Sequence, residues 1–246
     1  MQNDVRRQPA DGKLRVFLAQ LLMVNGDWDR ALTQLSVAAE LEASALPMLH
    51  TYSAAIQCER LRADVFRGAR SPLVLGEPVP WLAGFLQALA LEADGKPEQA
   101  ASQRAEALEG AAATSGSLNG TSFEWIADAD SRLGPILEVL LNGAYYWVPF
   151  ERISRIVIEA PSDARDLVWL PAQFTWTNGG EAMGFLPVRY AGSESSQDNA
   201  VRLARKTEWR ALSGDGYAGL GQRVLSSDRD EVGLLDVREL TLNAAA

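Results

Sequence analysis

The sequence has little of the chemistry that most enzymes need. It contains one cysteine and one histidine in 246 residues. A lone cysteine cannot form a disulfide within the chain, which fits a reducing compartment. Cys58 stands in a helical pattern, so we expect a small buried side chain rather than a reactive thiol. His50 alone cannot build a site of several imidazoles, and no G-x-S-x-G sequence marks a hydrolase nucleophile. We expect His50 to be solvated or to lie near a helix end.

The chain also lacks long apolar runs and basic blocks. No run approaches the roughly 18 residues that suggest a membrane span. The opening residues 1–13 are polar and do not resemble a secretory signal, so we expect a cytoplasmic protein. The formal net charge is −9, and acidic residues outnumber basic ones in both halves. Nucleic acid and membranes are therefore poor partner candidates, and a protein or a small ligand is expected.

Residues 1–112 predict a helical module. Apolar residues recur at i, i+3 and i+4 on either side of Asn25-Gly26, as Leu14, Phe17, Leu18, Leu21 and Leu22, then Trp28, Ala31, Leu32, Leu35 and Ala39. A small residue five positions after the turn glycine, here Ala31, is typical of tetratricopeptide repeats. The same spacing recurs from Gly95 to Ala100, which is close to two 34-residue periods later. Residues 46–68 predict a helix without this hinge, so the array is degenerate.

The repeat register suggests that an earlier helical pair is incomplete. When Gly26 is aligned with the turn glycine of a tetratricopeptide repeat, Pro9 occupies the position of the proline that closes the preceding repeat. Eight residues before Pro9 are too few for two helices. We expect either missing first helices or a short cap. An apolar face exposed there would favour a partner or self-association as a homodimer.

The composition changes after residues 110–122, a small and polar stretch that predicts a linker. Residues 121–243 predict a β-rich domain. Asn142-Gly143 joins two β-prone runs and predicts a type I′ hairpin. Further strands are expected within residues 153–160, 166–176, 182–190, 222–227 and 232–240, with one short helix in 193–212. The predicted fold class is α+β, a tetratricopeptide-like antiparallel helical array followed by a small, strongly bent sheet or partial barrel.

The stretch FEWIADADSR, residues 123–132, gathers three carboxylates on Glu124, Asp128 and Asp130. Two carboxylates can divide acid and base work, and several can bind a hard cation. The spacing fits neither well, since a calcium loop needs further oxygen ligands and a glycine at its sixth position. Solvated, capping or ion-paired carboxylates that organise the start of the β domain are the favoured interpretation. Partner binding is second, and a metal or hydrolytic site is third.

Two other motifs are weaker. GDGYAG, residues 214–219, matches G-x-G-x-x-G but is followed by a strand-like run instead of a helix, which favours a loop over a nucleotide site. No cofactor is expected. In the aromatic run of the hairpin, strand alternation sends Tyr145 and Trp147 to one face and Tyr146 to the other. One face would build the core, and the other could present an aromatic for binding.

Two longer motifs, F-E-W-I-x-D-x-D-x-R-x-G-P at Phe123–Pro135 and N-G-x-Y-Y-W-V-P-F-x-R-I at Asn142–Ile153, resemble the ImpE/TagJ family of type VI secretion accessory proteins. The resemblance extends over nearly the whole chain. It departs at the start, where family members usually have another helical hairpin. The resemblance implies a non-enzymatic adaptor. Such a protein would bind the N-terminal helix of the small sheath subunit (TssB type) and associate with the ClpV-type ATPase that disassembles contracted sheaths.

The resemblance assigns no binding residue, so the partner surface is argued from physics. A helical module could receive an amphipathic helix in a groove, or the β domain could receive an extended segment at a free edge. The candidate partner-binding residues are Phe17, Leu21, Trp28, Trp81, Phe85, Trp125, Asp128, Asp130, Arg132 and Tyr146. A generic helical-repeat scaffold for another protein remains the alternative to the secretion adaptor.

Overall fold

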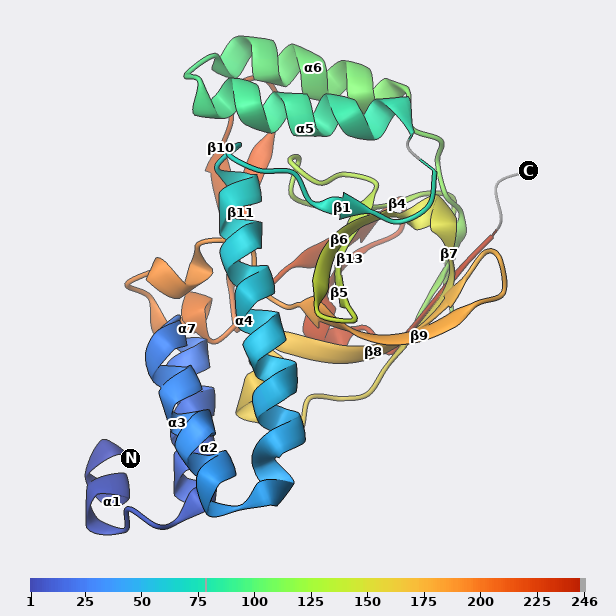
Figure 1. The fold of residues 1–246 in the computed structure, drawn as a ribbon. Coiled ribbons are helices and arrows are strands. Elements are labelled where there is room, and N and C mark those ends of the chain that lie inside the picture. Colours follow the sequence, from blue (N-terminus) through green and yellow to red (C-terminus); the bar gives the residue numbers. More distant parts are fainter. Residues whose placement is uncertain (78, 244–246) are drawn as a thin grey trace.

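The computed structural model describes residues 1–77 and 79–243. Its first half is helical and its second half is built from strands, so the fold is α+β (Figure 1). The helices are α1 (Gln2–Arg7), α2 (Gly12–Val24), α3 (Trp28–Leu41), α4 (Leu46–Phe66), α5 (Pro80–Ala93), α6 (Pro97–Glu109) and α7 (Asn199–Arg202). Short 3-10 helices are η1 (Ala43–Ala45), η2 (Phe150–Arg152), η3 (Ala164–Leu167), η4 (Ser193–Ser195) and η5 (Leu234–Asp236). No helix within the described residues is long and apolar enough to cross a membrane.

Two helical hairpins, α2–α3 and α5–α6, are closed by the same turn geometry. Gly26 and Gly95 both have φ of +73°, a left-handed conformation that glycine adopts without strain. Ala31 and Ala100, five residues after each glycine, are fully buried where the second helix crosses the first. The two hairpins do not stack on each other. Figure 1 places them at opposite ends of the long helix α4.

The strands form one large sheet and two small ones. They are β1 (Leu73–Val74), β2 (Gly116–Leu118), β3 (Thr121–Phe123), β4 (Ile126–Asp128), β5 (Ile136–Leu141), β6 (Ala144–Pro149), β7 (Ile153–Ile158), β8 (Trp169–Trp176), β9 (Glu181–Pro187), β10 (Thr207–Ala211), β11 (Tyr217–Gly221), β12 (Val224–Ser227), β13 (Glu231–Gly233) and β14 (Glu239–Leu242). The large sheet has the order β1-β6-β5-β9-β8-β7-β14-β2-β3, and the small ones are β10-β11 and β13-β12-β4. All pairs are antiparallel except β1 with β6. The large sheet curves into a partial barrel (Figure 1).

Two apolar cores lie on the two faces of this sheet. Strand β5 is buried along its whole length, because its alternate side chains enter different cores. Leu137, Val139 and Leu141 join the core inside the curved sheet. Ile136 and Leu140 join the core shared with the helices, which also contains residues of α2–α5 and the aromatic rings of β6 and β8. The helices therefore bury their apolar faces against the outer face of the sheet as well as against each other.

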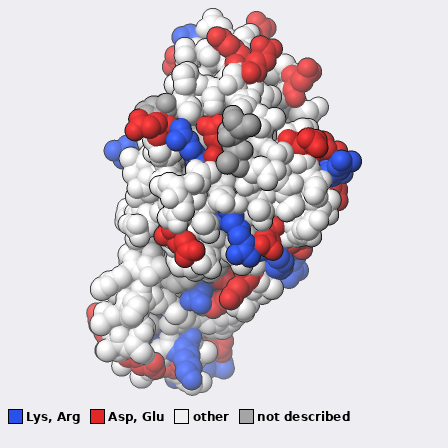
Figure 2. All heavy atoms as spheres, turned by 90° about the vertical axis from the view of Figure 1, so that its right-hand side faces the viewer, with Lys and Arg blue, Asp and Glu red and all other residues white. Residues whose placement is uncertain are grey.

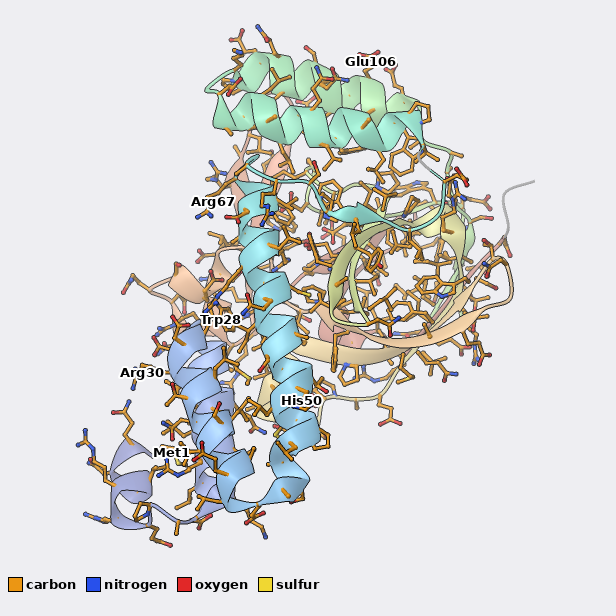
Figure 3. The ribbon with its side chains drawn as sticks, viewed as in Figure 1. Met1, Trp28, Arg30, His50, Arg67 and Glu106 are labelled. Carbon is orange, nitrogen blue, oxygen red and sulfur yellow. The ribbon has the colours of Figure 1, made fainter. Side chains whose placement is uncertain are left out.

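Several predictions are confirmed. The Asn142-Gly143 turn closes the β5–β6 hairpin with positive φ at both residues, and Tyr145 and Trp147 share one buried face. The expected short helix is α7. Cys58 is buried, with its Sγ 3.4 Å from the Gly143 carbonyl oxygen. His50 is exposed on α4 (Figure 3).

Other predictions need correction. The large sheet has nine strands and is not small. The supposed linker 110–122 contains β2 and the start of β3, which are joined by a tight turn at Asn119-Gly120. The glycine-rich stretch 214–219 is half turn and half strand, because it joins β10 to β11.

Candidate functional site

The stretch 123–132 folds into β4 and the two turns that follow it. Each aspartate caps a turn: Asp128 Oδ1 accepts the Asp130 backbone N–H at 2.9 Å, and Asp130 Oδ1 accepts the Arg132 N–H at 2.9 Å. This is the local side-chain to backbone bonding that favours aspartate in turns. Asp128 and Asp130 are buried, whereas Glu124 is exposed. The three carboxylates therefore do not form one cluster.

Asp128 binds Arg223, which is buried beside it. Arg223 donates to Asp128 Oδ2 from both Nε (3.0 Å) and Nη2 (2.8 Å), so two guanidinium N–H groups share one carboxylate oxygen. The Tyr190 hydroxyl donates to Asp128 Oδ1 at 2.9 Å. Burial raises the pKa of Asp128 to about 6, although Arg223 works in the opposite direction. This aspartate is thus an internal anchor that ties β4 to the start of β12 and to the chain after β9.

Asp130 binds Arg132, and the pair closes the second turn. Arg132 donates to Asp130 Oδ2 from Nη2 at 2.5 Å and to Oδ1 from Nε at 2.9 Å. Asp130 Oδ2 also accepts the backbone N–H of Gly219 at 2.9 Å, which holds β11 against this turn. The Arg132 guanidinium lies 4.8 Å from the ring centroid of Phe66 at the end of α4. The predicted turn and ion-pair role of these residues is confirmed.

Glu138 is the centre of a second group of buried charges. It accepts from Arg62 of α4 at 2.6 and 2.8 Å, and from the Tyr145 hydroxyl at 2.5 Å. Arg223 Nη1 lies 3.5 Å from Glu138 Oε2 and so links the two groups. Burial tends to raise the pKa of Glu138, but the charges of Arg62 and Arg223 outweigh it and hold the pKa below its usual range.

We call the whole set the ionic cluster. It consists of Glu59, Asp128, Asp130, Glu138, Arg62, Arg132, Arg189 and Arg223. The set holds four carboxylates and four guanidinium groups, so its formal charges balance, although the Arg189 guanidinium donates to the Val24 and Arg202 carbonyl oxygens rather than to a carboxylate. The described residues contain no group of three or more side chains suited to hold a metal ion. Since the aspartate oxygens already accept from arginine, tyrosine and backbone donors, the arrangement fits structural support better than acid–base or metal chemistry.

The residues beside the ionic cluster line a large hollow of the surface. It is an open groove of about 750 Å³ between α6 and the chain around β4. One wall is α6, with Ala101, Ala105 and Leu108, and the other runs from Trp125 to Ala129. Phe85 and Gly134 lie at its base. Gly134 has φ of +55°, and a side chain there would meet the Phe85 ring at 3.1 Å, so only glycine fits without displacement.

The groove lining is mainly apolar and partly exposed. Leu108 and Trp125, on opposite walls, keep 55% and 39% of their surface exposed. Two of the three charged lining side chains are already paired, Asp128 with Arg223 and Arg104 with Glu92. The third, Asp215, is exposed in the turn between β10 and β11. Partly exposed apolar surface gathered in a hollow is typical of places where another apolar surface can pack.

The structure brings only some of the predicted binding residues together. Phe85, Trp125 and Asp128 line this groove. Trp81 lies next to Phe85 at 6.1 Å between ring centroids, but lines a shallow hollow on the other side of α5–α6. Asp130 is fully buried and Arg132 nearly so, which leaves neither free for a partner. Tyr146 is partly buried against the core inside the sheet.

The remaining candidates lie elsewhere. Phe17 is 43% exposed and lines a hollow with Met48 at the base of α2–α4. Leu21 is half-buried on the same helix. Trp28 packs on Trp169, 5.8 Å between centroids, at the top of α3 beside α4 (Figure 3).

Sequence reasoning missed most of the ionic cluster. Its members Arg62, Glu138 and Arg223 come from distant segments with no local motif in common. One signal was available: Glu138 is the only charge in the apolar strand ILEVLL, and a lone charge buried in a strand needs a partner. The groove residue Leu108 was also missed, because its position on α6 looks like an ordinary helical apolar site.

Comparison with known proteins relates this chain to a group of bacterial proteins. A sequence model described as ImpE protein matches residues 120–241. The type VI secretion system accessory component TagJ of Pseudomonas aeruginosa is 50% identical over 240 residues, which cover 98% of this chain and 84% of that protein. The crystal structure of protein VPA1032 from Vibrio parahaemolyticus superposes with a TM-score of 0.89 at 26% identity. The match covers 98% of this chain and 90% of that one.

Proposed function

The chain belongs to the ImpE family and is a type VI secretion accessory component, and we propose that it acts as a non-enzymatic cytoplasmic adaptor. In this proposal it holds the N-terminal helix of a TssB-type sheath subunit and associates with a ClpV-type disassembly ATPase. The family supplies the secretion context. The groove between α6 and β4 supplies the means of binding, and it is the observation that carries the proposal.

The groove has the form that an amphipathic helix needs. A helix docks by placing residues i, i+3, i+4 and i+7 into an apolar channel. Ala101 and Leu108 are seven residues apart on α6, which is about 10 Å of helix. Small side chains at Ala101 and Ala105 allow a second helix to approach α6 closely, while Trp125 offers a flat aromatic face from the opposite wall.

The ATPase is proposed to use a different surface. Support for this partner comes from the family resemblance. Phe17, Ala38 and Met48 line a second partly apolar area at the base of α2–α4. Figure 1 places that area and α6 at opposite ends of α4, so two partners could bind at once. We also propose that the two helical hairpins derive from tetratricopeptide repeats, since both keep the glycine-to-alanine spacing.

The test is calorimetric titration of the full-length protein with a peptide of the sheath subunit's N-terminal helix. We expect saturable binding, and we expect Leu108→Asp to weaken it strongly because a carboxylate would enter the apolar wall. Met183→Asp is the matched control, because Met183 is 65% exposed on β9 outside the groove. Absence of binding by the unmodified protein would reject the sheath-subunit proposal.

The two alternatives can be separated from this proposal. For a metal or hydrolytic site at Glu124, Asp128 and Asp130, a divalent cation should raise the melting temperature, and Asp128→Asn with Asp130→Asn should abolish the rise. For a generic scaffold, a pull-down from a cell that carries the secretion system should retain other proteins and not the sheath subunit. The pairing of both aspartates with arginines favours the adaptor.

A further inference from the structure

The geometry points to a cationic amphipathic helix as the occupant of the groove, one whose apolar face is bordered by lysine or arginine. This inference deepens the proposed function and rests on it for the idea that the groove receives a helix. It adds the charge of the partner, which neither the family nor the relatives state. The argument comes from the position of carboxylates along the two walls.

One side of α6 carries an acidic border to the groove. A stripe of exposed residues follows the spacing i, i+4, i+7, i+11: Glu98, Ser102, Ala105 and Glu109. Eleven residues are about three helical turns, so the two glutamates point in nearly the same direction. Ser102 and Ala105, between them, line the groove. The two carboxylates therefore stand at the two ends of the stripe that forms this wall.

The opposite side adds another carboxylate. Asp215 lines the groove from the turn between β10 and β11, and it is exposed. This turn touches α6, since a side chain at Gly214 would meet Ala101 Cβ at 3.2 Å. A helix lying along α6 would thus have Glu98 and Asp215 near one end and Glu109 near the other.

Among the described residues, no salt bridge in or beside the groove uses these carboxylates. The salt bridges of the α5–α6 hairpin, Lys96–Asp94 and Arg104–Glu92, use other acidic residues. Arg104 is the single basic side chain in the lining, and it is nearly buried. Figure 2 shows the acidic side chains gathered over the α5–α6 end of the molecule, at the top of that view. Charges at the edge of an apolar interface steer the partner and set its orientation more than they add affinity.

The partner chemistry follows from these positions. Its apolar residues would face Leu108, Trp125 and Phe85. Its flanking residues would be lysine or arginine, about two helical turns or more apart, so that they reach carboxylates at both ends. A helix with acidic flanks would place like charges next to Glu98 and Glu109, and repulsion would exclude it.

A charge-swap experiment tests the inference on the full chain. Two synthetic helical peptides of about 14 residues share one leucine face and carry either lysine or glutamate at the flanking positions. We expect the lysine peptide to bind at least about tenfold more tightly than the glutamate peptide at low salt. The preference should shrink as the salt concentration rises, because exposed charges are screened.

The protein variants complete the swap. The triple variant Glu98→Lys, Glu109→Lys and Asp215→Lys should reverse the preference between the two peptides. A control variant, Glu40→Lys, Glu181→Lys and Glu231→Lys, changes the net charge equally at exposed positions outside the groove and should keep it. The three proteins are compared with each peptide only after equal melting temperatures show that the exposed substitutions leave the fold intact.

The outcomes separate this inference from the proposed function. Equal affinity of both peptides, binding of neither, or the same preference in both triple variants would overturn the cationic-helix assignment. If the sheath peptide binds but the charge swap has no effect, the adaptor proposal stands and the assignment fails. If the lysine peptide binds with the expected reversal while the sheath peptide does not, the groove chemistry is right and the partner is a different protein.

Discussion

Replacing Glu138 with glutamine should unbalance the ionic cluster at its centre. Glutamine has nearly the same size, so the change creates no cavity, but it removes the charge and replaces one of the two accepting oxygens with an NH2 group that cannot accept from Arg62. It leaves four arginines facing three carboxylates in the interior. Arg62 would keep its hydrogen bond to the Arg189 carbonyl oxygen, 2.7 Å away, but lose its bidentate partner. Breaking a buried ion pair from one side costs about 3–5 kcal/mol of unfolding free energy.

The cost can be read as a melting temperature. For a chain of this length each kcal/mol shifts the midpoint by about 2–4 °C, so Glu138→Gln should melt roughly 6–20 °C below the unmodified protein. The control is Glu239→Gln, which breaks the exposed 2.6 Å pair between Glu239 and Arg155. That pair is solvated, and its loss should cost less than about 1 kcal/mol. Circular dichroism during heating measures both variants.

A second substitution checks the mechanism. Adding Arg62→Met to Glu138→Gln should cost less than Arg62→Met alone, because the arginine has already lost its partner. The reasoning is refuted if Glu138→Gln melts within about 2 °C of the unmodified protein, or no lower than Glu239→Gln. Strict additivity of the two substitutions would also contradict it, since it would mean that Arg62 and Glu138 do not interact.

Three further predictions concern single positions. The folded state raises the pKa of Asp128 to about 6, so the stability that its proton contributes is fully present below its unfolded pKa of ~4 and is lost as pH rises through 6. In urea unfolding, the free energy of unfolding of the unmodified protein relative to Asp128→Asn should therefore increase by about 2–3 kcal/mol from pH 7 to pH 4. A difference that stays constant with pH would contradict this. Gly221→Ala should lower the free energy of unfolding by more than about 3 kcal/mol, because φ is +96° and the new Cβ would meet the Lys206 carbonyl oxygen at 2.0 Å. Gly179→Ala is the control: φ is also positive there but the surrounding space is open, so the loss should be about 1–2 kcal/mol in the same urea assay. Burial raises the pKa of Cys58 to about 11, so a thiol reagent should label the folded protein at pH 8 far more slowly than the urea-unfolded chain. Equal labelling rates would contradict this, because they would show that the thiol is accessible in the folded protein.

Local signals in the sequence predicted the elements that depend on local chemistry. Asn142-Gly143 could be placed because its positive φ values are those of a type I′ turn between two strongly β-prone runs. Asn119-Gly120 carries the same signal, with φ of +49° and +84°, but its strands are only three residues each and rich in small polar side chains. The flanking composition hid the turn, and the segment was interpreted as a linker.

Features that depend on distant contacts could not be predicted. Strand β1 pairs with β6 over two residues, 73 positions along the chain from its partner, and nothing in Leu73–Val74 itself indicates a strand. The aspartates of 123–132 were recognised as structural, yet Arg223, 95 residues away, could not be named as a partner. The groove likewise depends on how α6 and β4 come together. Periodicity could show that α6 is helical, but not which of its sides stays uncovered.

The place of β14 in the large sheet has a consequence for synthesis. Among the described strands, the β2–β3 hairpin joins the sheet through β14, which pairs with β2 on one side and β7 on the other. Residue 123 leaves the ribosome well over a hundred residues before residue 239. At roughly 5–20 residues per second, the hairpin waits for several seconds or more before its neighbour exists. The helices wait as well, since Trp147 and Trp169 complete their core. A nascent chain of this protein therefore keeps apolar helix faces uncovered until residue 169 has emerged, and leaves the β2–β3 hairpin without its neighbour for longer still.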